Sequence, residues 1–204
     1  MISFILLQRH RSLVIDQFRA RTGWISIQVS APVRIETERL VLHGHTIDEF
    51  EPLAEMWADP AVVKHINGKP STAQESWMRL LRYRGLWPLL GYGYWAVREK
   101  SSGRFAGDLG FADFHRRVEP SIEGVPEAGW VLAGWAQGQG FATEALRGAL
   151  TWLDRQESHA RSVCLITPDN ISSIRVAEKN GFTLAGAVRG VEEETLLYLR
   201  ERQS

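Results

Sequence analysis

A glycine-rich stretch between an apolar segment and an amphipathic one could bind an anionic ligand in this protein. It reads Gln137-Gly138-Gln139-Gly140-Phe141-Ala142-Thr143. Glycine lets the backbone approach a ligand closely, and the free N–H groups at a helix start present the favourable end of the helix dipole to an anion. A diphosphate fits this chemistry. For the pair of glycines taken alone, a tight strand-to-helix turn without a ligand is an equally good interpretation.

The spacing of these glycines does not match two other phosphate-binding motifs. A dinucleotide fingerprint G-x-G-x-x-G needs a third glycine where Thr143 stands, together with a parallel strand–helix–strand unit. The Gly68-Lys69 pair lacks both the upstream glycine and the following hydroxyl residue of a Walker A loop. The sequence therefore does not favour a nucleotide-binding oxidoreductase.

Composition excludes several other classes of function. The 24 basic and 24 acidic residues cancel, so no global field directs the chain toward nucleic acid or an anionic membrane. Eight tryptophans without a basic stripe are more typical of core packing and a substrate cleft than of a nucleic-acid surface. His43 and His45 alternate on a strand without a third ligand in register, so no metal site is expected. Cys164 is the only cysteine, which excludes an internal disulfide and indicates a reducing, cytoplasmic compartment.

The elements that must position the glycine-rich turn follow from apolar periodicity and capping signals. They predict an α/β domain with a mixed sheet that is antiparallel in its first half. The expected strands are 38–45, 94–98, 104–111, 127–133, 162–167, 182–188 and 194–199. The expected helices are 46–59 behind a Thr46–Glu49 capping box, 71–84 ending at Gly85, 141–153, and 170–179 closed by Asn180-Gly181.

Residues 1–32 are expected to form a peripheral, partly disordered extension before a domain at 33–204. Their apolar run is too short to span a membrane, and the arginines follow the run where a signal peptide would have them precede it. We therefore expect no membrane partner.

Two segments carry a resemblance to a known family. Gln137 to Ala142 resembles the Q/R-x-x-G-x-G/A signature of the GNAT superfamily, and Asn170 to Phe182 resembles the N-x-x-S-x-x-x-x-E-K-x-G-F segment of its RimJ/RimL-like branch. With the opening residues 36–40 and the hairpin through 107–110, the resemblance covers roughly residues 34–200. It implies a mixed, largely antiparallel sheet with a splay between the fourth and fifth strands, flanked by helices.

The resemblance also implies a site for acetyl-CoA. The strand before the turn would pair its exposed backbone with the pantetheine amides, the turn's N–H groups would hold the pyrophosphate, and Asn170 would bond the pantetheine arm. The implied coenzyme-binding residues are Trp130, Val131, Leu132, Gln137, Gly138, Gln139, Gly140, Phe141, Ala142, Thr143, Asn170 and Ser173.

Two residues are expected to act in catalysis. Many members of the superfamily carry a tyrosine acid where this chain has Ala177, so the resemblance points to Ser173 as the group that assists the leaving thiolate. A helix serine bonded to the carbonyl one turn earlier is the competing interpretation. Glu127 matches a carboxylate common in the branch and is the expected base for the amine, with Asp108 and Asp113 as alternatives.

The implied activity is acetyl transfer from acetyl-CoA to an amine by direct attack in a ternary complex (EC 2.3.1), without a metal. The acceptor would be a protein N-terminal α-amine or a small-molecule amine, selected by loops at about 60–72 and 84–93. An α-amine, with a pKa of about 7.7–8.0, needs less help from a base than a lysine does. The missing tyrosine leaves a catalytically silent acyl-CoA-binding or sensing module as the alternative. A monomer or a homodimer is expected.

Overall fold

The computed structural model describes residues 32–66, 68–191 and 194–203. The extension expected at 1–32 lies outside these residues apart from Pro32. The strands are β1 Ile35–Glu36, β2 Leu40–Gly44, β3 Tyr94–Glu99, β4 Phe105–Ala112, β5 Glu127–Leu132, β6 Arg161–Ile166, β7 Thr183–Val188 and β8 Thr195–Glu201. The helices are α2 Phe50–Ala58, α3 Pro60–Val63, α4 Ala73–Leu90, α5 Phe141–Asp154 and α6 Ile171–Lys179, with 3-10 turns η1 Ile47–Glu49 and η2 Gly134–Ala136.

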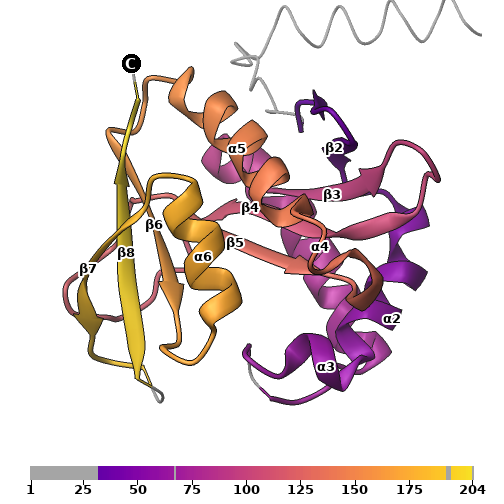
Figure 1. Cartoon of the computed structure of the whole chain (residues 1–204), viewed down its shortest axis with the longest axis horizontal. Helices are drawn as coiled ribbons and strands as arrows, with labels where there is room; N and C mark the ends of the chain where they lie inside the picture. The colour runs from indigo at the N-terminus through magenta and orange to yellow at the C-terminus, as the bar shows by residue number, and fades with distance from the viewer. Residues whose placement is uncertain (1–31, 67, 192–193, 204) are drawn as a thin grey trace, which may run out of the picture.

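All eight strands form one sheet in the order β1-β2-β3-β4-β5-β6-β8-β7 (Figure 1). Strand β5 pairs with β6 in parallel, and the other named neighbours pair antiparallel. The mixed, largely antiparallel sheet predicted from the sequence is therefore confirmed. The short strand β1 is an addition to the predicted set.

The sheet opens between β5 and β6. Glu127 opposite Val163 is the one register pair that joins the two strands, and the Val163 N–H donates to the Pro126 carbonyl at 3.0 Å. Figure 1 shows the two strands diverging from this point, with β6–β8 steeply inclined to β3–β5. These strands are the predicted fourth and fifth, so the expected splay is confirmed.

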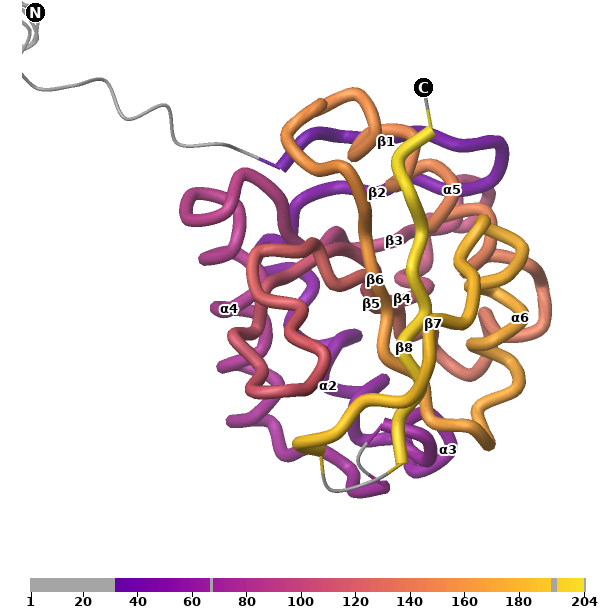
Figure 2. The backbone as a smooth tube through the Cα atoms, turned by 90° about the vertical axis from the view of Figure 1, so that its left-hand side faces the viewer, coloured from indigo at the N-terminus to yellow at the C-terminus, as the bar shows by residue number. Residues whose placement is uncertain are grey.

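Helices cover both faces of the sheet, with α5 and α6 on one side and α2 and α4 on the other (Figures 1 and 2). Successive strand residues face opposite sides, and β4 shows the consequence. Leu109 and Phe111 belong to the core beneath α5, whereas Ala112 belongs to the core beneath α2 and α4. The apolar spacing that predicted α5 corresponds to its buried face. Ala145, Leu146 and three further apolar residues toward the C-terminus of α5 are buried on that face.

Helix α4 is longer than the sequence predicted. Thr72 and Glu75 form the expected capping box, but the helix passes through Gly85 and ends only at Leu90. Leu86 and Trp87 are buried, so packing beyond Gly85 outweighs the roughly 1 kcal/mol cost of a helical glycine. The prediction of an acceptor-selecting loop at 84–93 is therefore wrong, since most of that range belongs to α4.

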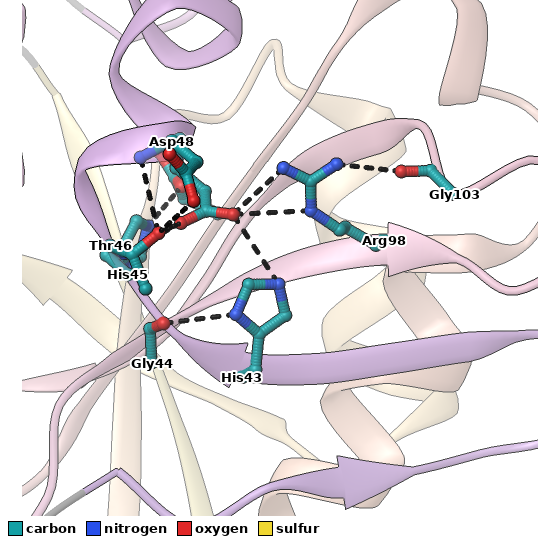
Figure 3. Close-up of polar contacts among 9 residues, drawn as sticks. His43, Gly44, His45, Thr46, Asp48, Arg98 and Gly103 are labelled. Carbon is teal, nitrogen blue, oxygen red and sulfur yellow. Dashed lines mark hydrogen bonds and ion pairs between the residues drawn. The ribbon is translucent and has the colours of Figure 1, made fainter.

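The 3-10 turn η1, which leads into α2, begins with a second capping box and ends on a buried carboxylate, Glu49. The Thr46 N–H donates to Glu49 at 2.7 Å, which confirms the predicted box. Arg98 and His43, both drawn in Figure 3, reach the same carboxylate at 2.9 and 3.7 Å. Hydrogen bonds from Arg98 and Thr46 lower the pKa of Glu49 against the opposing effect of its burial. His43 therefore has a structural role.

No helix in the described ranges is long and apolar enough to cross a membrane.

Candidate active site

The glycine-rich turn joins β5 to α5 in the conformation that the sequence suggested. Gly138 and Gly140 have φ angles of +74° and +79°, in the left-handed region that favours glycine. Gly140 is the N-cap residue of α5 and supplies no capping side chain. The Gln137 side chain donates to the Leu132 carbonyl at 3.0 Å, which ties the turn to the end of β5.

Six consecutive N–H groups in this turn have no hydrogen-bond acceptor among the described residues. They run from Gly138 to Thr143, and the next N–H, of Glu144, already bonds the Gly140 carbonyl at 3.1 Å. Unpaired N–H groups in left-handed turns and at helix starts form a concave site for an anion. The turn can therefore receive a phosphate group without any basic side chain.

The predicted turn residues differ in whether they line a cavity, and Gly140 and Thr143 line neither of the two cavities described below. Gln137, Gly138 and Ala142 line a cavity of about 180 Å³. Gln139 instead directs its side chain back to the Trp135 carbonyl at 2.6 Å, and Phe141 is buried in the core beneath Arg39. Gln139 and Phe141 can therefore offer a ligand only their backbone.

A larger cavity of about 360 Å³ lies in the splay between β5 and β6. It shares Trp130, Val131, Asn170 and Ser173 with the smaller cavity, so the two form neighbouring parts of one groove. Glu127 lines the larger cavity as well. The tertiary structure thus brings both predicted catalytic residues into the space beside the predicted coenzyme strand.

Glu127 is the only carboxylate among the described residues that lines the larger cavity. Burial raises its pKa, although an ion pair with Arg116 at 2.9 Å acts in the opposite direction. A buried carboxylate with a raised pKa is suited to accept a proton near neutral pH. Arg116 at the same time keeps the carboxylate available in its ionised form.

The two alternative bases are engaged elsewhere. Asp108 is fully buried, where it accepts from His45 at 2.7 Å and from the Trp57 indole at 3.2 Å. Asp113 accepts from the backbone N–H groups of His115 and Gly124 at 2.8 and 2.9 Å. Their oxygens hold the fold together, which favours Glu127 as the proton acceptor.

Ser173 and Asn170 occupy the first turn of α6. The Asn170 carboxamide oxygen accepts from the Ser173 N–H at 3.1 Å and the Ser172 hydroxyl at 2.9 Å, so Asn170 is the N-cap. The Ser173 hydroxyl has no hydrogen-bond partner among the described residues. The competing interpretation was that the Ser173 hydroxyl bonds the carbonyl one helical turn earlier. Thr151 in α5 makes such a bond, to the Arg147 carbonyl at 2.9 Å, but Ser173 does not. The Ser173 hydroxyl is therefore available to a ligand.

Several cavity residues were not singled out by their sequence pattern. Trp57, Arg79, Arg82, Tyr83 and Tyr94 line the larger cavity together with the two predicted catalytic residues. Arg79, Arg82 and Tyr83 are spaced at i, i+3 and i+4, which places them on one face of α4. This spacing was the sequence signal that could have identified them as neighbours on a cavity wall.

Cys164 also lines the larger cavity. It was expected to be buried and inert, and it is 1% exposed. Burial raises the pKa of its thiol, so the thiol stays protonated and is a poor nucleophile.

Known proteins share this architecture. The acetyltransferase (GNAT) domain family matches residues 39–183. The chain is 27% identical over 177 residues to YkkB of Bacillus subtilis, covering 85% of this chain and 98% of that protein. A Bordetella pertussis protein assigned to the GnaT acetyltransferase family has 30% identity and a TM-score of 0.72, covering 82% of this chain and 99% of that one.

The fold is also that of RimL, a ribosomal L7/L12 α-N-protein acetyltransferase whose structure contains coenzyme A. The two chains are 22% identical, with a TM-score of 0.67 over 83% of this chain and 98% of RimL. At that identity the likeness concerns the fold.

Proposed function

Because the chain belongs to the GNAT acetyltransferase family, whose members are acetyl-CoA-dependent N-acetyltransferases, we propose that it acetylates an amine by direct attack in a ternary complex. The observation that carries this proposal is the groove that runs from six unpaired N–H groups, past the open edge of β5, to Glu127 and Ser173. The coenzyme A complex of RimL, which has the same fold, supports the proposal.

Each part of the coenzyme has a chemical counterpart in the groove. The pyrophosphate would lie on the N–H groups of residues 138–143, and the pantetheine amides would pair with the β5 backbone at Trp130, Val131 and Leu132 as an added strand does. The Asn170 oxygen serves the helix cap, so its NH₂ group is the one free to donate to pantetheine.

The reaction needs a neutral amine, a stabilised tetrahedral intermediate and a protonated or hydrogen-bonded leaving group. The amine nitrogen attacks the thioester carbonyl and its surplus proton passes to the Glu127 carboxylate. The C–S bond then breaks while the Ser173 hydroxyl donates a hydrogen bond to the departing sulfur. A thiolate with a pKa near ~8.5 is a good leaving group, so a strong acid at the Ala177 position is not required.

Two chemically matched variants test the coenzyme site. Asn and Asp tolerate positive φ better than other residues, and an added Cβ at Gly138 meets no atom within 4 Å. Gly138→Asp places a negative charge beside the pyrophosphate, whereas Gly138→Asn adds nearly the same volume without charge. We expect Gly138→Asp to bind acetyl-CoA roughly tenfold or more weakly than Gly138→Asn at low salt.

Calorimetry measures acetyl-CoA affinity, and release of free thiol in the presence of amines measures turnover. Gly103, in the β3–β4 hairpin, has a φ of +69° and also has no atom within 4 Å of an added Cβ. The Gly103→Asp control should therefore carry a similar backbone strain with unchanged affinity. Equal affinities of the Gly138→Asp and Gly138→Asn variants would place the pyrophosphate elsewhere.

The single buried Cys164 further supports a reducing, cytoplasmic location as part of this proposal.

A further inference from the structure

The larger cavity is rich in arginine on the side away from the glycine-rich turn. Arg79 and Arg82 enter it from α4, and Arg116 enters from the loop between β4 and β5. Each guanidinium lies over an aromatic ring, with Arg79 at 3.5 Å from the Trp57 centroid and Arg82 and Arg116 at 5.4 and 4.9 Å from that of Phe114. Cation–π contacts of this kind stabilise the position of a guanidinium group while its N–H groups can still donate hydrogen bonds.

One of these charges is neutralised within the protein. Arg116 forms the ion pair with Glu127 at 2.9 Å described above. His65, the remaining basic residue on the cavity wall, pairs with Asp169 at 3.1 Å. Arg79 and Arg82 therefore supply the uncompensated positive charge of the wall.

Arg79 is a cation without a carboxylate partner in the described part of the chain. Its Nη1 donates to the Ser71 hydroxyl at 3.3 Å, and its buried Nε has no partner there. Burial lowers the pKa of Arg79, as expected for a cation removed from water. Asp108 and Glu75 attract it at longer range, but the Asp108 oxygens already accept from His45 and Trp57, and Glu75 accepts from Thr72 in the α4 capping box.

Arg82 adds a second cation three residues along the same helix face. Apart from the rings of Phe114 and Tyr83, it has no hydrogen bond or ion pair with the described residues. Two guanidinium groups on one wall can together hold a carboxylate or phosphate group through charge-assisted hydrogen bonds.

We infer that the acceptor amine carries an anionic group, a carboxylate or a phosphate, that Arg79 and Arg82 bind while the amine faces Glu127. This inference rests on the proposed acetyl transfer and narrows the class of its acceptor. The anion would anchor the acceptor on the α4 side, and the thioester would approach from the β5–β6 side. A free amino acid and the N-terminus of an acidic peptide both offer this chemistry.

Matched pairs of acceptors test the inference by thiol release from acetyl-CoA. One arm compares L-phenylalanine with its α-amide, and the other compares the peptide amides Ser-Glu-Ala and Ser-Gln-Ala. In at least one arm the wild-type protein should prefer the acid over its amide by roughly tenfold to a hundredfold in kcat/KM. The arm that shows the preference identifies the source of the anion.

The arginine variants assign the preference to this wall. Arg79→Gln should reduce the acid-to-amide ratio to within about twofold of unity, and Arg79→Lys should restore only part of it because lysine lacks the planar fork. Arg84→Gln on the same helix is the control, since Arg84 is exposed like Arg82 but does not line the cavity. It should keep the wild-type ratio.

The possible failures are distinguishable. Equal rates with acids and amides, accompanied by normal thiol release, would overturn the inference and leave acetyl transfer intact. If no acceptor in either arm reacts, calorimetry of coenzyme-saturated protein with glutarate and with inorganic phosphate tests the anion site directly. Binding that is lost in Arg79→Gln supports the site, and absence of such binding overturns it. A protein that neither binds acetyl-CoA nor releases thiol with any amine would instead contradict the proposed function.

Discussion

Replacing Ser173 by alanine should slow acetyl transfer while coenzyme affinity and folding stay close to normal. The hydroxyl has no hydrogen-bond partner among the described residues, and the Ser173 N–H that completes the α6 cap is retained in alanine. Loss of a half-buried, unpaired hydroxyl should change the free energy of unfolding by no more than about 0.5 kcal/mol.

The size of the rate effect follows from what the hydroxyl is proposed to contact. An ordinary neutral hydrogen bond contributes about 0.5–1.5 kcal/mol, whereas a donor to charge that develops in the transition state contributes about 2.7–4 kcal/mol. The hydrogen bond from a half-buried serine to a polarisable sulfur should contribute an amount between these limits. We therefore expect kcat to fall by roughly ten to a thousandfold.

Thiol release gives kcat, and calorimetry gives the acetyl-CoA dissociation constant. Ser172→Ala is the matched control on the same turn, because Ser172 lines only the smaller cavity on the coenzyme side and its hydroxyl bonds Asn170 at 2.9 Å. Equal kcat values for the two variants would refute the assignment of Ser173. A Ser173→Ala protein that loses affinity in proportion to rate would move the residue from catalysis to binding.

Three further outcomes are expected. Glu127→Gln should lower kcat by roughly a hundredfold or more with little change in acetyl-CoA affinity, which parallel kinetics and calorimetry check; a wild-type rate would make Glu127 structural. Arg116→Gln should raise the pKa of Glu127 further, so the acid limb of the kcat/KM–pH profile should move to higher pH, and an unmoved limb would separate this ion pair from catalysis. Gly129→Ala should lower the melting temperature because its Cβ would lie 2.1 Å from the Tyr94 hydroxyl. Adding Tyr94→Phe should restore much of the lost melting temperature, measured by thermal unfolding, and no recovery would contradict this source of strain.

The sequence was sufficient for the features that depend on neighbouring residues. The Thr46–Glu49 and Thr72–Glu75 capping boxes, the β3–β4 hairpin and the apolar face of α5 all form as predicted. Each depends on residues a few positions apart, where side-chain type and spacing decide the local hydrogen bonds. The turn at 138–143 belongs to the same class, since glycine spacing and a helix start are both local signals.

The tertiary structure decided which of the predicted groups share a cavity. From the sequence, Glu127, Asp108 and Asp113 were alternatives for the base, and only strand pairing and packing show Asp108 buried against His45 while Glu127 faces the splay. The length of α4 was likewise set by the burial of Leu86 and Trp87, and that helix carries the arginine wall. Such contacts join residues tens of positions apart, so they depend on how strands and helices meet in space, which local periodicity does not encode.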